Sequence, residues 1–132
     1  MALPRVNRLK RRQDFSLVYQ QGNRYKSRHL TLRVLRQLST KSSPLLRSPD
    51  PLSPWPIRVG IVVSLKVNKR AVVRNLIRRR LQAAFYHLLP YLKTGWDVVV
   101  IVHPLAWQCD YSQFLQELEQ LLTEAEVLHG RE

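Results

Sequence analysis

Two strongly apolar segments separated by one long amphipathic segment limit what this chain can fold into. Residues 57–64, IRVGIVVS, are rich in β-branched side chains and predict a largely buried strand in which Gly60 leaves room for a close neighbour. Residues 97–102, DVVVIV, form a continuous apolar run and predict a strand in the centre of a sheet. The residues between them place one apolar stripe on a helical wheel, which predicts a helix packed on that sheet. The stripe comprises Val73, Ile77, Leu81, Ala84 and Leu88.

The preceding segments complete the prediction of an α+β sandwich. Residues 14–21 have apolar side chains at helical spacing, and Gly22 stands where a left-handed cap would end the helix. Residues 29–37 alternate as a strand does. One face would carry Leu30, Leu32, Val34 and Arg36, and the other Thr31, Arg33 and Leu35. The predicted order is α-β-β-β-α-β-α in one domain over residues 1–132, with a flexible connection rich in proline and serine at residues 39–56.

The C-terminal segment predicts a helix with one buried and one acidic face. Asp110 or Ser112 can cap its first turn. The buried face comprises Phe114, Leu115, Leu118, Leu121, Leu122 and Ala125. The outward face comprises Glu117, Glu119, Glu124 and Glu126.

The charge of the chain is divided unevenly. Residues 1–96 carry 21 basic side chains against Asp14 and Asp50, a net charge of +19, whereas residues 97–132 carry Arg131 against seven carboxylates, a net charge of −6. Residues 66–81, KVNKRAVVRNLIRRRL, contain seven cations and no anion, so like charges repel along the predicted helix. This pattern indicates a polyanionic partner, and charge alone does not choose between RNA, DNA and an anionic membrane.

Several kinds of site are not indicated by the sequence. No apolar run approaches the roughly 20 residues of a membrane span, and no signal peptide marks the chain for export, so we expect a cytoplasmic protein with no membrane partner. The histidines and Cys109 lack the spacing of a metal site, and the basic region lacks a carboxylate cluster for Mg²⁺. We expect no catalytic and no metal-binding residue on this chain. A nuclease that uses Asp14, Asp97 or Asp110 is the weakest alternative.

The function that remains is binding to the phosphates and bases of a nucleic acid. Arginines along the basic helix can pair with phosphates through bidentate hydrogen bonds. Phe15 and Tyr19, one helical turn apart, either stack on unpaired bases or only pack their helix on the sheet. Asn75 either bonds a base edge or a sugar, or satisfies local backbone groups.

These residues together resemble the protein subunit of bacterial ribonuclease P. The basic segment is similar to the RNR signature of that family, with Arg74-Asn75-x-Ile77-Arg78-Arg79. Further matches are Arg58-Val-Gly60, Val63-Ser64, Lys66, Ala71-Val72, Phe85 and the strand from Asp97. The amino-terminal matches are Arg8-Leu9-Lys10, Asp14-Phe15, Val18-Tyr19 and Gly22. The resemblance covers the chain except for the Pro-rich connection.

The resemblance implies both a fold and a function. The fold would join two parallel strands through a left-handed crossover, against the usual hand. The function would be that of a ribonucleoprotein whose RNA subunit, holding most of the Mg²⁺, hydrolytically removes the 5′ leader of precursor tRNA. The RNA subunit would contact Lys66, Lys69, Arg70, Arg74, Asn75, Arg78, Arg79 and Arg80. The precursor tRNA leader would lie in a cleft formed by Phe15, Tyr19 and the adjoining sheet.

Two positions depart from the family pattern. Leu76 replaces the second arginine of the signature, and Leu65 stands where many relatives have lysine. Arg80 lies about 40° round the wheel from Leu76 and is predicted to supply one of the missing phosphate contacts. The alternative function is a ribosomal or other structural RNA-binding protein without a role in catalysis, which leaves Phe15 and Tyr19 unexplained.

Overall fold

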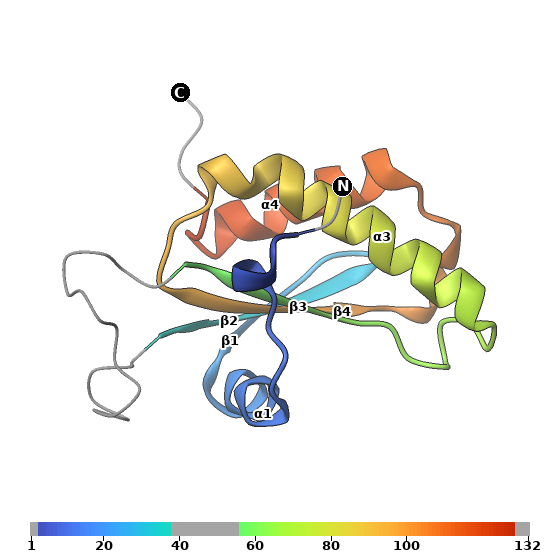
Figure 1. Ribbon diagram of the computed structural model, residues 1–132. Helices are drawn as coiled ribbons and strands as arrows, with labels where there is room; N and C mark the ends of the chain where they lie inside the picture. Colours follow the sequence, from blue (N-terminus) through green and yellow to red (C-terminus); the bar gives the residue numbers. More distant parts are fainter. Residues whose placement is uncertain (1–2, 38–55, 129–132) are drawn as a thin grey trace.

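The computed structural model describes residues 3–37 and 56–128 and shows a sheet with helices on both faces (Figure 1). Helices α3 (Ala71–Leu88) and α4 (Tyr111–Glu124) cover one face, and α1 (Arg12–Gln21) lies on the other. The strands are β1 (Asn23–Lys26), β2 (Leu30–Arg36), β3 (Arg58–Val62) and β4 (Trp96–Val102). Short 3-10 helices are η1 (Arg5–Asn7), η3 (Leu89–Tyr91) and η4 (Pro104–Gln108). The predicted α+β class is confirmed.

Two further predictions concern the proline-rich connection and membrane-spanning helices. Of the predicted flexible connection, residues 39–55 lie outside the described residues. In the part that the structure describes, no helix combines the length and the apolarity needed to cross a membrane.

The strands lie in the order β1-β2-β4-β3, so β4 has a neighbour on each side. β4 pairs antiparallel with β2 and parallel with β3, and β1 pairs antiparallel with β2. Val98, Val99 and Val100 are fully buried, because helices cover both faces of the sheet at this point. The prediction that residues 97–102 form a central strand is confirmed.

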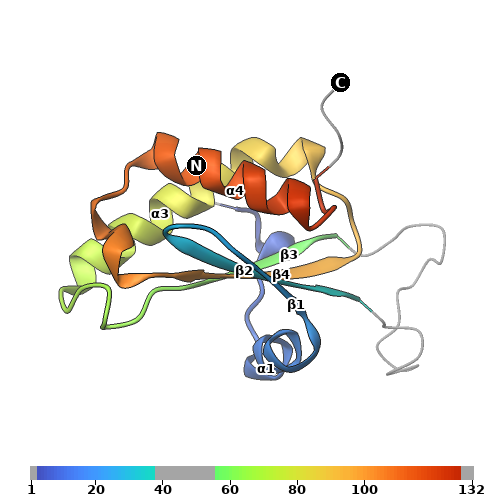
Figure 2. The same ribbon diagram turned by 180° about the vertical axis from the view of Figure 1, so that it is seen from behind.

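The connection from β3 through α3 to β4 is a left-handed crossover. In Figure 1, β3 runs from left to right in front of β4, α3 returns above the sheet, and β4 again runs from left to right behind β3. Figure 2 shows the same arrangement from behind, with α3 now farther from the viewer than α4. The hand that the family resemblance implied is therefore present. The chain order places the start of α3 beyond the carboxyl end of β3.

Alternating side chains of the sheet divide the interior into two clusters. Leu30, Leu32 and Val34 of β2 lie in the main core beneath α3 and α4, as predicted. Leu35 faces α1, where a smaller cluster is built on Leu9, Val18 and Val99. The predicted stripe of α3 is buried except Val73, which is half-buried, and Phe85 joins it. The helix is thus anchored by one face, and its cations lie on the remainder.

The end of α1 differs from the prediction. Gly22 is extended, with φ −77° and ψ 155°, so the predicted left-handed cap is wrong. Space explains the glycine instead, because a Cβ there would lie 2.5 Å from the carbonyl oxygen of Val18 and 2.9 Å from that of Val34. The end of the helix therefore runs directly against β2.

The start of α4 agrees with the prediction, whereas its outer face does not. Asp110 is the N-cap, and its Oδ1 accepts a hydrogen bond from the backbone nitrogen of Gln113 at 2.9 Å. Ser112 lies inside the helix. Glu117 was assigned to the outward face, but its side chain is only 13% exposed and bonds the turn between β1 and β2. That assignment was wrong because the turn, which lies far away in sequence, folds over this part of α4.

Candidate nucleic-acid interface

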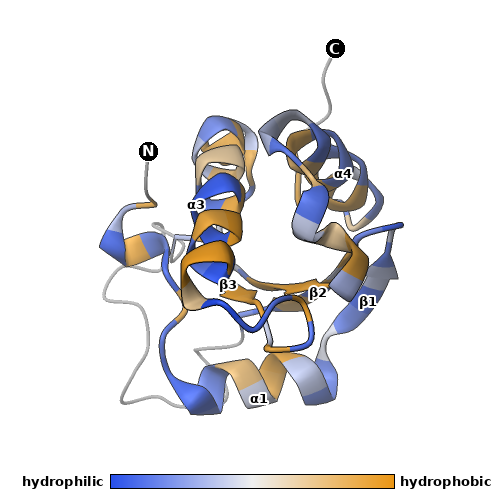
Figure 3. Ribbon diagram, turned by 90° about the vertical axis from the view of Figure 1, so that its right-hand side faces the viewer, coloured by the Kyte–Doolittle hydropathy of each residue, from blue (hydrophilic) through white to orange (hydrophobic). Residues whose placement is uncertain are grey.

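The basic segment begins in the connection from β3 to α3, which lies at the end of the molecule nearest the viewer in Figure 3. Lys66, Lys69 and Arg70 are exposed there. The backbone nitrogen of Arg70 donates to Oδ1 of Asn68 at 2.9 Å, which fixes the turn before the helix. The first turn of α3 carries no acidic residue. The helix dipole and the cations therefore both favour an anion at this end.

Two arginines of α3 are held in place by hydrogen bonds to the protein. Arg74 Nη1 donates to the carbonyl oxygens of Asn68 at 3.0 Å and Lys69 at 2.9 Å. Arg78 Nη1 donates to Oδ1 of Asn75 at 3.0 Å. Each guanidinium has five N–H donors, so most of its donors remain for a ligand. Asn75 is exposed and keeps its amide donors.

Among the described residues, no carboxylate forms an ion pair with the cations of this segment. Within residues 3–37 and 56–128, the ion pairs with carboxylates are made by His29 and Arg58. Arg79 is exposed on α3. A row of unneutralised guanidiniums on an anchored helix is suited to binding a polyphosphate.

A groove of about 290 Å³ links the basic helix to the amino-terminal helix. The Phe15 ring forms part of its lining and packs over Gly60, where a Cβ would lie 2.4 Å from the ring. Arg78 lines the same groove from α3. The remaining lining residues are Leu3, Arg8, Leu9, Lys10, Val59, Ile61 and Gln82, together with Gly60. The structure thus brings an aromatic ring and a guanidinium, predicted separately, to one concave surface.

Tyr19 lies one turn farther along α1 and is not part of that lining. Its side chain is 37% exposed, and the guanidinium of Arg33 lies over its ring at 5.6 Å from the centroid. Arg33 Nη1 also donates to the carbonyl oxygen of Tyr19 at 2.8 Å. Burial raises the pKa of Tyr19 and outweighs the lowering effect of Arg33, so the phenol stays protonated. The ring therefore offers a surface already paired with a cation.

The carboxylates proposed for a nuclease have other partners. Asp97 accepts from Arg58 Nε at 2.9 Å and from Nη2 at 2.7 Å, and Asp14 accepts from Nη1 at 3.3 Å. The pKa of Arg58 is raised: burial acts to lower it, but the hydrogen bonds and charges of Asp97 and Asp14 outweigh that effect. Asp110 caps α4. All three carboxylates therefore hold structural contacts.

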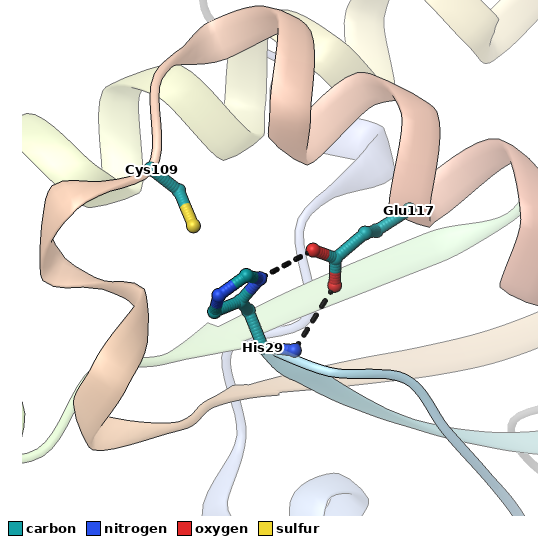
Figure 4. Close-up of side chains that lie close together, drawn as sticks. All are labelled: His29, Cys109 and Glu117. Carbon is teal, nitrogen blue, oxygen red and sulfur yellow. Dashed lines mark hydrogen bonds and ion pairs between the residues drawn. The ribbon is translucent and has the colours of Figure 1, made fainter.

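Three potential metal ligands from distant parts of the sequence meet beside α4. Atoms of His29, Cys109 and Glu117 lie within 4.8 Å of one another (Figure 4). Glu117 pairs with Nδ1 of His29 at 2.5 Å and accepts from the backbone nitrogen of His29 at 3.1 Å and from Oγ of Ser27 at 2.6 Å. Sequence spacing gave no sign of this group. Its hydrogen bonds join the turn before β2 to α4.

Replacing Glu117 by glutamine should weaken this junction in a pH-dependent manner. Burial alone would raise the pKa of Glu117, but hydrogen bonds from His29 and Ser27 outweigh it, and the pKa lies below its ordinary value. The stabilisation is therefore complete above the unfolded pKa of about 4.3 and is lost as pH falls through the lower folded pKa. We expect the variant to lose about 1 to 2 kcal/mol of unfolding free energy at pH 7.

Urea unfolding of the two proteins between pH 7 and pH 3 measures this difference. Glu124→Gln is the matched control, because Glu124 is exposed at the end of the same helix. A difference between wild type and Glu117→Gln that stays constant down to pH 3 would contradict the assigned role of the carboxylate.

Comparison with known proteins decides the family. Residues 3–126 match the model of the protein family described as Ribonuclease P. The chain belongs to the ribonuclease P protein family.

Similar ribonuclease P proteins come from several bacteria. A ribonuclease P protein component from Cyanothece sp. is 54% identical over 129 residues, covering 97% of this chain and 98% of that protein. One from Trichormus variabilis is 50% identical over 138 residues, covering 98% of this chain and 99% of that protein. The RNase P protein of Staphylococcus aureus has the same fold, with a TM-score of 0.73 at 24% identity over 93% of this chain and 98% of that one.

The two departures from the family pattern lie on the surface. Leu76 is 43% exposed and Leu65 is 64% exposed. Arg80 is half-buried, and its Nη1 donates to the carbonyl oxygen of Cys109 at 2.8 Å, so part of this side chain connects α3 to the start of α4. That Arg80 supplies one of the phosphate contacts missing at Leu76 and Leu65 stays a hypothesis. Such a contact would have to use the guanidinium donors of Arg80 that do not bond Cys109.

Proposed function

We propose that this chain binds the catalytic RNA of ribonuclease P through α3 and binds the 5′ leader of precursor tRNA in the groove beside Phe15. As a member of the ribonuclease P protein family, the chain is the protein component of a ribonucleoprotein with a role in tRNA 5′ processing. The observation that carries the finer proposal is the groove that joins Phe15 to Arg78. It connects a stacking surface for unpaired bases with the cationic helix that would hold the RNA subunit.

The cations of α3 and its preceding connection would contact phosphates of the RNA subunit. These are Lys66, Lys69, Arg70, Arg74, Arg78, Arg79 and the free donors of Arg80, with Asn75 bonding a sugar or base edge. Each neutralised phosphate releases counterions, so affinity for the RNA should fall steeply with salt. Arg78, which also lines the groove, would lie where the RNA subunit and the leader meet.

The hydrolytic step is assigned to the RNA subunit, with Mg²⁺ held mainly by that RNA. The proposed interface suits this division, because it presents guanidinium groups rather than the oxygen ligands that Mg²⁺ prefers. Asp14, Asp97 and Asp110 are engaged by Arg58 or by the start of α4. The protein would contribute binding energy and position the substrate, which lowers the Mg²⁺ concentration needed for cleavage.

Reconstitution with the RNA subunit tests the proposal. At low Mg²⁺, the chain should stimulate cleavage of precursor tRNA with a long leader more than cleavage of one whose leader is one or two nucleotides. Phe15→Ala should remove that leader dependence, and Arg78→Ala should weaken RNA binding about tenfold or more, the value of a charge-assisted hydrogen bond. Lys26→Gln is the control, because Lys26 is exposed on β1, at the edge of the sheet opposite β3.

Three outcomes would contradict the proposal. RNA binding without any stimulation of cleavage would favour a structural RNA-binding protein. Equal stimulation of substrates with long and short leaders would exclude the leader groove. Cleavage by the chain without its RNA would support the protein nuclease.

A further inference from the structure

A second concave site lies on the opposite side of the sheet from α1. It is a cleft of about 570 Å³ lined by Asn23, Tyr25, Arg36, Lys93, Thr94, Trp96, Ala125 and Glu126. In the sheet register, Tyr25 is opposite Leu32 and Arg36 is opposite Trp96. Because Leu32 lies in the main core beneath α3 and α4, these side chains occupy that same face. The cleft opens where α4 ends and no longer covers the sheet.

The guanidinium of Arg36 and the ring of Trp96 form the centre of this cleft. Trp96 is half-buried and packs against the main core, and the guanidinium of Arg36 lies over its ring at 5.8 Å from the centroid. Arg36 is itself exposed, so its guanidinium is accessible to a ligand. Guanidinium planes and aromatic rings are the surfaces on which proteins stack unpaired RNA bases. Tyr25 adds a second ring to the lining.

Charges of both signs line the cleft without pairing to one another. Arg36 and Lys93 are cationic and Glu126 is anionic, and among the described residues no ion pair joins them. Glu126 is held at the end of α4, where the backbone nitrogen of Val127 donates to the carbonyl oxygen of Leu122 at 3.0 Å. The cations can therefore bind a phosphate while the carboxylate accepts a hydrogen bond from a base.

We propose that this cleft binds unpaired RNA, with a base stacked on the Arg36–Trp96 pair and an adjacent phosphate near Lys93. Glu126 accepts from an exocyclic amino group, so the cleft prefers cytosine to uracil, which carries a carbonyl there. The lining of planar groups, cations and one acceptor fits a nucleotide better than an acidic peptide, which would need cations alone. This inference rests on the proposed function only in that the chain acts on RNA, and it concerns a surface separate from α3 and Phe15.

Indole ¹H–¹⁵N NMR signals of the full chain give a site-specific test. The Trp96 signal is assigned as the one absent from Trp96→Phe, and the probes are the tetranucleotides of cytidine and of uridine. Cytidine tetranucleotide should shift this signal saturably, and Arg36→Gln or Lys93→Gln should raise the dissociation constant about tenfold. Glu126→Gln should remove the preference for cytidine. Phe15→Ala should leave the Trp96 titration unchanged, which separates this site from the leader groove.

Other results would overturn the proposal. An unmoved Trp96 signal would place any binding elsewhere, and an equal response to a glutamate hexapeptide would show a site for charge alone. Photocrosslinking from Thr94→p-benzoylphenylalanine in the complete ribonucleoprotein identifies the source of the RNA, because Thr94 is exposed at the rim. Crosslinks to the RNA subunit or to precursor tRNA would support the site and name its ligand. Crosslinks to neither RNA would contradict it.

Discussion

Replacing Gly60 by valine should remove the leader-dependent part of cleavage and lower the free energy of unfolding by about 1 to 3 kcal/mol, the usual cost of overpacking a well-packed interior. A Cβ at this position would lie 2.4 Å from Cζ and 2.5 Å from Cε1 of Phe15. The ring must therefore move. Because Phe15 forms part of the groove lining, the substitution changes the shape of the proposed leader site directly.

The control variants separate this steric effect from general damage to β3. Val63→Ala alters a residue of the main core just beyond β3 that does not line the groove, and it should leave leader dependence intact. Phe15→Leu combined with Gly60→Ala should recover stability relative to Gly60→Ala alone, because the smaller side chain frees the space. Urea unfolding and cleavage of substrates with long and short leaders provide the measurements. Full leader dependence in Gly60→Val would show that the ring position does not matter.

Periodic patterns in the sequence were sufficient to predict the elements that bury one continuous face. The stripe of α3 and the alternation of β2 are set by residues close together in the chain, so local spacing contains the information. β1 was needed by the predicted order but was not located, because NRYK has no apolar alternation. That strand exists through its pairing with β2, which is a tertiary contact.

Side chains whose partners are distant in sequence were predicted less well. Gly60 was expected to admit a close neighbour, but only the folded chain identifies that neighbour as Phe15. Glu117 follows the polar spacing of an outward helix face. In the folded chain it bonds Ser27 and His29, which are about 90 residues away in the sequence. The groove shared by Phe15 and Arg78 has the same origin. Residue types predicted the chemistry of the candidate site, and the topology of the sheet determined which of them meet.

Replacing Arg58 by methionine should destabilise the chain by about 3 to 5 kcal/mol, the range for removing one partner of a buried ion pair. Asp97 is only 5% exposed, and after the substitution its carboxylate would keep the hydrogen bond from Gln37 Nε2 at 2.9 Å but no countercharge. The methionine restores most of the apolar volume, so the expected loss arises from the unpaired charge. Arg58 also bonds Asp14 of α1, and its removal should loosen α1 on the sheet.

A double-mutant cycle isolates the charge effect. Adding Asp97→Asn to Arg58→Met should recover part of the lost stability, because an amide at this position needs no countercharge. Asp14→Asn alone should cost less than about 1 kcal/mol, since its contact of 3.3 Å is partly exposed and screened by solvent. Unfolding in urea is measured for the wild type, Arg58→Met, Asp97→Asn and the double variant, which form the cycle, and for Asp14→Asn. Equal losses of unfolding free energy for Asp14→Asn and Arg58→Met would show that the ion pair with Asp14 of α1 contributes more than neutralisation of the buried Asp97. The shape of the groove would then depend mainly on how α1 is held on the sheet.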